Sequence, residues 1–134
     1  MNITNKIHTQ QFATEAAMGS AFYTWAHNTY LHLHGLLFHV PNEIPRAKGE
    51  TKTDHMRRIQ HLKAQGLVSG VPDYIYMGEP AKNKPAMLIE LKLPNGTVSA
   101  EQKRIHQTYR DAGLEIHVVR TFAEWEALIA RIVA

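Results

Sequence analysis

The sequence predicts a mixed α/β domain, in which a short sheet is flanked by helices in the order α-β-α-β-β-α-β-α. Short apolar runs bounded by glycine or proline predict buried strands. Longer stretches with apolar residues at helical spacing alternate with these runs, and at two places Ser or Thr precedes Gln or Glu by three residues, as at helix starts. At 134 residues, the chain is expected to form a single domain, 1–134.

Helical spacing occurs in four stretches, which cover residues 9–30, 53–65 and 99–112 and the chain from Thr121 onward. Capping boxes formed by Ser99 with Gln102 and by Thr121 with Glu124 begin the last two helices. The residues expected on the buried sides are Phe12, Ala13, Ala16, Phe22 and Trp25 in the first helix, Met56, Ile59 and Leu62 in the second, Ile105, Tyr109 and Ala112 in the third, and Trp125, Leu128, Ile129 and Ile132 in the fourth.

Four apolar runs, at residues 36–40, 71–77, 86–93 and 114–119, predict the strands. Pro41 closes the first run, and Pro94-Asn95-Gly96 ends the third. Residues 41–50 contain two prolines and one glycine, so we expect a loop there. The third run is strongly apolar and is followed by helices, which favours a central place in the sheet.

The composition excludes several classes of protein. Hydrophobic residues make up 44% and charged residues 20%, as in ordinary globular domains, and the absence of cysteine excludes thiol catalysis and Cys-ligated metals. A compact monomer of 15.2 kDa should expose about 7,100 Å². Without a long apolar run or a signal-like start, we expect a cytoplasmic protein (in the bacterial host if phage-encoded) with no membrane partner.

Glu90 and Lys92 interrupt the most apolar predicted strand. Because side chains alternate along a strand, both lie on the same face as Leu88, opposite Ile89 and Leu91. Burying a carboxylate and an ammonium there is costly unless they are paired or bind something. A half-exposed strand with a same-face ion pair is the alternative interpretation.

Asp73 opens the preceding strand and can lie beside Glu90 if the two strands pair. Adjacent carboxylates repel each other, and a divalent cation such as Mg²⁺ relieves this repulsion while leaving room for water and phosphate. Lys92 would then contact the phosphate or the attacking water as a point charge. Alternatively, Asp73 only caps the turn after Gly70.

Two further polar residues lie near this pair in the predicted fold. Gln102 lies on the sheet-facing side of its helix, although as the capping-box partner of Ser99 it needs no other role. Glu15 lies at the edge of the apolar face of the first helix, where a solvated carboxylate is the ordinary alternative.

These segments together resemble the VRR-NUC branch of the PD-(D/E)XK nuclease superfamily. The resemblance rests on GVPD at 70–73, IELK at 89–92 and SAEQ at 99–102, and it extends to Glu15 ahead of Trp25, to HVPNE at 39–43, and to Gly66 and Gly113. It covers about residues 12–130. No single motif is specific, but their order and spacing are.

The resemblance implies a PD-(D/E)XK nuclease-like fold, with a central mixed sheet of about four strands, and a cation, Mg²⁺ or Mn²⁺. It implies that Asp73, Glu90, the backbone carbonyl of Leu91 and, from the first helix, Glu15 bind the metal. It further implies that Lys92 assists the nucleophile and that Gln102 supports the site. Where the family often has a glutamine four residues after the first-helix glutamate, this sequence has Gly19.

A basic stretch gives a candidate surface for nucleic acid. Between Arg46 and Lys63 there are six basic residues against two acidic ones, while the whole chain carries a formal charge of +3. Such a stretch can follow a phosphate backbone, or it can simply be a solvated helix face. The residues proposed for phosphate contact are Arg46, Lys48, Lys52, Arg57 and Arg58.

Other ligands find less support. His32, His34 and His39 invite a zinc site, but they lack the neighbouring carboxylates that such sites use. No glycine-rich loop that cradles phosphates is present, so we expect no nucleotide cofactor.

We therefore expect a metal-dependent DNA endonuclease. The resemblance extends to homodimeric resolvases of branched DNA such as four-way (Holliday) junctions, with a phage or mobile element as one fitting source. A dimer provides the two cuts that a symmetric junction needs. The alternatives are a monomeric nicking or flap nuclease and a DNA-binding module without catalysis.

Overall fold

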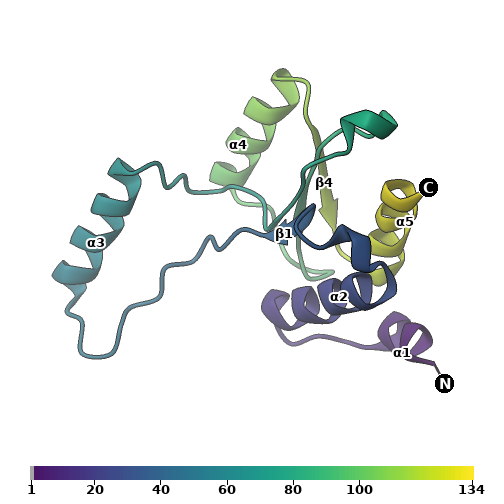
Figure 1. Ribbon diagram of the computed structural model, residues 1–134. Helices are drawn as coiled ribbons and strands as arrows, with labels where there is room; N and C mark the ends of the chain where they lie inside the picture. Colours follow the sequence, from purple (N-terminus) through teal and green to yellow (C-terminus); the bar gives the residue numbers. More distant parts are fainter. Residues whose placement is uncertain (1) are drawn as a thin grey trace.

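The computed structural model describes residues 2–134, and its elements follow the predicted order after one additional N-terminal helix (Figure 1). Two short 3-10 helices, η1 (Leu31–Leu33) and η2 (Pro80–Lys82), lie in the connections. The helices are α1 (Ile3–Thr9), α2 (Glu15–Thr29), α3 (Lys52–Ala64), α4 (Ala100–Asp111) and α5 (Phe122–Val133), and the strands are β1 (Leu37–His39), β2 (Tyr74–Tyr76), β3 (Met87–Leu91) and β4 (Glu115–Val119).

The four strands form one mixed sheet in the order β1-β2-β3-β4, which confirms the predicted fold class. β2 pairs antiparallel with both β1 and β3, whereas β3 and β4 are parallel and are connected through α4. β3 therefore lies inside the sheet, as expected, and all five of its residues are buried.

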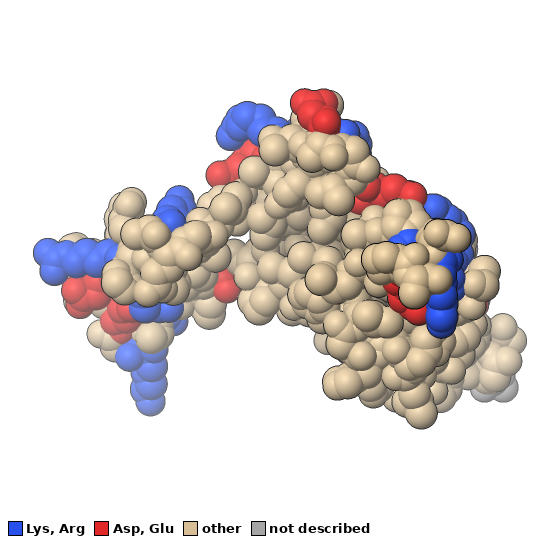
Figure 2. Space-filling model, turned by 45° about the horizontal axis from the view of Figure 1, so that its top comes forward, with Lys and Arg blue, Asp and Glu red and all other residues tan. Residues whose placement is uncertain are grey.

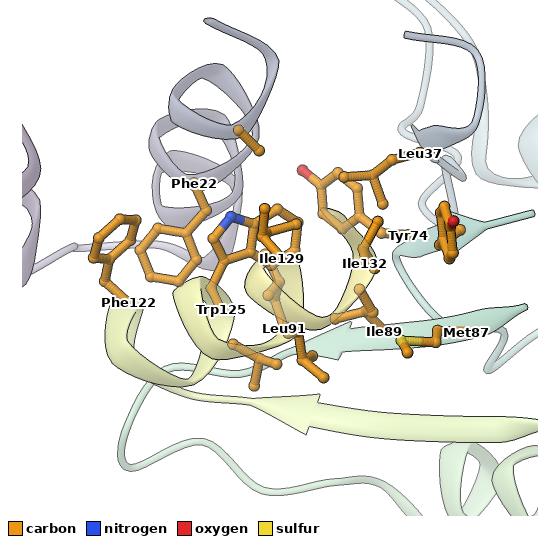
Figure 3. Packing of buried hydrophobic residues seen from close by; sticks show 14 of the residues in the cluster. Phe22, Leu37, Tyr74, Met87, Ile89, Leu91, Phe122, Trp125, Ile129 and Ile132 are labelled. Atoms are coloured by element: carbon orange, nitrogen blue, oxygen red, sulfur yellow. The ribbon is translucent and has the colours of Figure 1, made fainter. Parts of the chain in front are cut away.

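The core lies between one face of this sheet and the helices α2 and α5 (Figure 3). Period-2 alternation directs Ile89 and Leu91 of β3 into it, where they meet Phe22 of α2 and Trp125 and Ile129 of α5. The predicted buried stripe of α5 is confirmed, because all four of its residues are buried. The opposite face of β3, which carries Glu90, is covered by α4 instead.

The predicted first helix begins too early. α2 starts at Glu15, because the Thr14 side chain accepts a hydrogen bond from the amide of Ala17 at 3.1 Å and so caps the helix there. Ala13 and Ala16 are consequently exposed, while residues farther along α2, from Met18 to Ala26, fill the core. The preceding residues form α1, which the sequence analysis did not predict.

The predicted inner face of α3 was wrong. None of the thirteen residues of this helix, all of them described, is buried, and Met56 is 55% exposed. The reason is that α3 stands away from the sheet at the end of two extended segments (Figure 1), so its helical spacing meets no core. The molecule accordingly exposes 8576 Å², well above the roughly 7,100 Å² of a compact monomer.

In α4 the buried position also differs from the prediction. Ile105 and Tyr109 are only half-buried, and Ala112 is exposed where the helix ends. The one buried residue of the described α4 is His106, because the helix packs its 102–106 line onto the polar face of β3. No helix within residues 2–134 has the length and apolar character needed to cross a membrane.

Candidate active site

A cleft of about 780 Å³ opens beside the sheet, and every side chain predicted for catalysis lines it. Its walls are the start of α2, the segment after β1, the start of β2 and the end of β3. The fold thus brings Asp73, Glu90, Lys92, Gln102 and Glu15 to one place, although they are far apart in the sequence.

Asp73 lies next to Glu90. In the β2–β3 register Tyr74 faces Ile89, so one step back Asp73 falls opposite Glu90 on the polar face. Asp73 Oδ2 accepts a hydrogen bond from the backbone amide of Leu91 at 2.7 Å. The carboxylate is therefore fixed to the end of β3 rather than capping the turn after Gly70.

Glu90 is 1% exposed. Burial, and then the negative charge of Asp73, raise the pKa of Glu90 to about 8, while the charge of Lys92 opposes this rise. One carboxylate oxygen, Oε1, accepts a hydrogen bond from Gln102 Nε2 at 2.9 Å. The other, Oε2, has no hydrogen-bond partner among residues 2–134.

Lys92 is 8% exposed and continues the line of Glu90 into the cleft. Within the described chain, the carboxylate near its Nζ is that of Glu15, whose Oε1 lies 4.0 Å away, and no ion pair joins Lys92 to Glu90. The same-face ion pair considered above is thus replaced by a longer contact to the start of α2. Because the Glu15 side chain is 42% exposed, it can turn toward the cleft or toward solvent.

Gln102 fulfils both interpretations of its position at once. Its backbone N–H donates a hydrogen bond to Ser99 Oγ at 3.1 Å, and its side-chain oxygen accepts one from the backbone N–H of Ser99 at 2.9 Å. Together these two bonds complete the capping box. The side-chain nitrogen remains free for Glu90. The cap therefore holds the amide group in the orientation that lets it bind the carboxylate.

The HVPNE segment, to which the sequence analysis gave no role, holds Asp73 from the other side. The Asp73 carbonyl accepts a hydrogen bond from the Val40 amide at 2.7 Å and lies 2.9 Å from His39 Nδ1, which therefore carries the proton. Asn42 Nδ2 donates to the Val71 carbonyl at 2.7 Å and lies 3.4 Å from Asp73 Oδ1. The position of this segment at the end of β1 was the sequence feature that could have indicated its role in holding Asp73.

His106 is the second residue that the sequence analysis missed. It is 2% exposed, and its Nε2 lies 3.9 Å from Glu90 Oε2. Burial, followed by the positive charges of Arg110 and Lys92, lowers the pKa of this imidazole. Its place four residues after Gln102, one helical turn on, could have indicated it.

Gly19 departs from the family pattern for a steric reason. A Cβ atom at this position would lie 2.8 Å from the hydroxyl oxygen of Tyr74 and 3.3 Å from Leu91 Cδ1. Tyr74 occupies this part of the cleft wall, and burial raises its pKa to about 12. A larger side chain at position 19 would therefore collide with Tyr74 in this chain.

The donor set suits a hard cation. Carboxylate oxygens of Asp73 and Glu90 are the ligands that Mg²⁺ and Mn²⁺ prefer, and Leu91, predicted to offer its carbonyl, lines the same cleft. Within residues 2–134, no three His, Asp or Glu side chains gather as a complete cation site. Water and substrate oxygens would thus have to complete the coordination, as is usual for Mg²⁺.

The basic candidates lie apart from the cleft. The segment 43–70, called the arm here, carries all five of them, and basic side chains project from its lobe on the left of Figure 2. Arg46, Lys48, Lys52 and Arg57 are exposed. Arg58 differs, because its guanidinium makes two 2.9 Å hydrogen bonds to the Glu50 carboxylate and one of 2.8 Å to the Pro45 carbonyl.

Comparison with known proteins identifies the fold and the family of this chain. A solved structure described as a VRR_NUC domain protein has the same fold, with a TM-score of 0.68 at 16% identity, over 92% of this chain and 91% of that one. No curated protein sequence matches. The family model of the VRR-NUC domain matches residues 16–123, a range that contains the whole cleft except Glu15. The chain therefore belongs to the VRR-NUC domain family of nucleases.

Proposed function

We propose that this protein is a divalent-cation-dependent DNA endonuclease that hydrolyses phosphodiester bonds. The observation that carries the proposal is the pair of carboxyl groups of Asp73 and Glu90, held side by side in the cleft with Lys92 beside them. Membership of a nuclease family supports it. A protein that only bound DNA would gain nothing from clustered carboxylates facing phosphate.

Asp73 and Glu90 would hold the cation, Mg²⁺ or Mn²⁺, together with the Leu91 carbonyl and, from α2, Glu15. The residues fit it, because two carboxylates lie side by side in the cleft, where their negative charges repel each other. When bound, a divalent cation offsets this repulsion and lowers the pKa of a water molecule in its shell.

Lys92 is the group proposed to act on the substrate. Its ammonium has three donors and no acceptor, so it can bind the scissile phosphate and the attacking water but cannot remove a proton while charged. In a cleft this enclosed, a fixed positive charge stabilises the negative charge that develops on the phosphate. Gln102 and the Leu91 amide keep the two carboxylates in place meanwhile.

The arm is proposed to bind the DNA backbone outside the cleft. The four exposed basic side chains, Arg46, Lys48, Lys52 and Arg57, are available for phosphates. Arg58 is better assigned to shaping the arm, because its guanidinium already binds Glu50 and Pro45.

For the substrate we propose branched DNA, with the four-way junction as the preferred form and a homodimer as the active species. A junction has two-fold symmetry, and two copies related by a two-fold axis place two cleavage sites symmetrically. The arm favours an extended substrate, because it carries phosphate-binding groups beyond the cleft.

The test is cleavage of end-labelled four-way junction, flap, nicked, duplex and single-stranded DNA in Mg²⁺ or Mn²⁺. We expect paired symmetric cuts in the junction, lost in Lys92→Ala and retained in the control Lys6→Ala on the distant helix α1. Cleavage of flaps or nicked DNA by a monomer would keep the nuclease and refute the resolvase. DNA binding without any cation-dependent cleavage would indicate a non-catalytic module.

A second measurement addresses the cation directly. Calorimetric titration with Mn²⁺ should give binding that Asp73→Asn abolishes, with Asp54→Asn on α3 as a matched control that leaves it unchanged. Wild-type protein that binds no Mn²⁺, with or without DNA, would contradict the proposed chemistry.

A further inference from the structure

Two buried polar atoms without partners face each other behind the cleft. Glu90 Oε2 and His106 Nε2 both lack a hydrogen bond within residues 2–134, and they lie 3.9 Å apart. Both side chains are almost fully buried. A buried polar atom without a partner costs free energy, so two of them in contact require an explanation.

The separation indicates what the explanation is. At 3.9 Å it exceeds the roughly 3 Å of a hydrogen bond by only about 1 Å. A direct approach of the two side chains by about 1 Å closes the gap. A protonated Glu90 could donate to an unprotonated Nε2, but an ionised Glu90, as a cation ligand is, can only accept a hydrogen bond, so the ring must then carry its proton on Nε2.

We propose that His106 is a positioning residue for Glu90, whose Nε2–H donates a hydrogen bond to Glu90 Oε2 when Glu90 holds a divalent cation. The inference rests on the proposed function and deepens it. His106 touches neither the cation nor the DNA; it acts through Glu90.

The arrangement of α4 supports this role. Gln102 and His106 lie one helical turn apart on the same face, and Gln102 already holds Oε1 of the same carboxylate at 2.9 Å. With His106 on Oε2, one helix would hold both oxygens and fix the rotation of the carboxylate about its last bond. Such outer partners orient metal ligands and are worth about 10- to 100-fold in metal affinity.

The surroundings of the ring favour its neutral form. Burial, followed by the positive charges of Arg110 and Lys92, lowers the pKa of His106, while the charge of Asp73 opposes this. A neutral ring can present either nitrogen as the donor. The experiment therefore has to determine which nitrogen carries the proton.

The test compares two substitutions by Mn²⁺ calorimetry. His106→Leu fills the space without a donor, whereas His106→Gln keeps a donor near the position of Nε2. We expect the Mn²⁺ Kd to rise at least about tenfold in His106→Leu and to recover to within about threefold in His106→Gln. Tyr109→Leu, which changes packing on the same helix away from Glu90, should leave the Kd unchanged.

A spectroscopic readout on wild-type protein remains decisive even if a variant fails to fold. Long-range ¹H–¹⁵N NMR of the Mg²⁺-saturated protein should show His106 protonated at Nε2. A proton on Nδ1, or unchanged Mn²⁺ affinity in folded His106→Leu, would overturn this inference alone. Wild-type protein that binds neither cation would overturn the proposed function and the inference with it.

Discussion

The Tyr74 hydroxyl occupies the space that a side chain at position 19 would need. The Tyr74 ring stacks on Tyr23, with centroids 6.0 Å apart, and packs against Trp125, so it has little freedom to move away. The shape of this part of the cleft wall therefore depends on having glycine at position 19, which leaves room for the phenol of Tyr74.

Gly19→Ala should destabilise the protein, although alanine favours a helix by about 1 kcal/mol over glycine. The new Cβ would meet the Tyr74 hydroxyl at 2.8 Å, and overpacking of this kind costs about 1–3 kcal/mol. In a Tyr74→Phe background the hydroxyl is gone, so the same change should become neutral or stabilising. Urea unfolding of the four proteins measures this; destabilisation of equal size in both backgrounds would refute the steric explanation.

Glu90 should make the cation-free protein less stable as the pH rises. Its pKa is about 8 when folded and 4.5 in its ordinary state, so between these values the folded protein holds a proton that the unfolded chain releases. The free energy of unfolding contributed by Glu90 is therefore fully present below about pH 4.5, falls up to about pH 8, and then stays level.

The measurement is urea unfolding in EDTA at several pH values for wild type and Glu90→Gln. The difference in stability between the two proteins should shift in favour of Glu90→Gln as the pH rises from 5 to 8. A difference that does not change with pH would show that Glu90 is ionised in the folded state.

At the scale of elements, the residues proposed to bind DNA lie on the arm, apart from the residues proposed for catalysis in the cleft. Lys52→Ala and Arg57→Ala should each weaken DNA binding and reduce the slope of log K against log salt by about one, because each would remove one proposed phosphate contact. Fluorescence anisotropy over a salt series measures this. Lys6→Ala is the matched control, and equal losses there would mean that only net charge matters.

Arg58→Ala should behave differently from its neighbour on the same helix. The hydrogen bonds from Arg58, and then that from the Ala47 amide, lower the pKa of Glu50 to about 2. The Glu50 carboxylate would keep only the Ala47 amide, and the arm would lose order around Pro45. We expect faster proteolysis within the arm, with a smaller change in salt slope than for Arg57→Ala. A full unit of slope lost, without faster proteolysis, would instead assign Arg58 to the DNA.

The elements that could be predicted from the sequence are those whose local signals agree with the tertiary packing. Ser99 and Gln102 mark the start of α4 because the cap is made by neighbouring residues. The strand-like alternation that continues from β3 to the next residue brings both Glu90 and Lys92 to the cleft. The prediction that the Met56 face of α3 is buried was wrong, because periodicity shows which residues share a helix face but not whether another element covers that face.

The charged residues of the candidate site could be predicted from the sequence, but some of its neutral residues could not. Its charged members were recognisable because a carboxylate within an apolar strand requires an explanation. His106 was not singled out, because its place one turn after Gln102 shows only that the two residues share a helix face. Whether that face is buried depends on how α4 is rotated against β3. Asn42 was likewise visible only as part of a motif until the strands placed it beside Asp73.

For the whole molecule, stability should be distributed unevenly. The residues of α5 fill the core, while α3 has none buried and is held by local contacts such as His55 to the Ile44 carbonyl at 2.6 Å. We expect amides of α3 to exchange hydrogen by local opening and those of α5 only on global unfolding. Exchange followed by mass spectrometry, with increasing urea, distinguishes the two; equal protection would mean that α3 is covered in solution.

The hydrogen bond from Asn42 to the Val71 carbonyl, at 2.7 Å, has a consequence for how such proteins can diversify. It ties the departing and returning ends of the arm together at its base, directly before Asp73. The arm is therefore an insertion whose two ends are held together, so a change in its length or sequence need not move the carboxylates. If the arm selects the substrate and the cleft cleaves it, as proposed, the two properties can change independently, since they lie on opposite sides of this hydrogen bond.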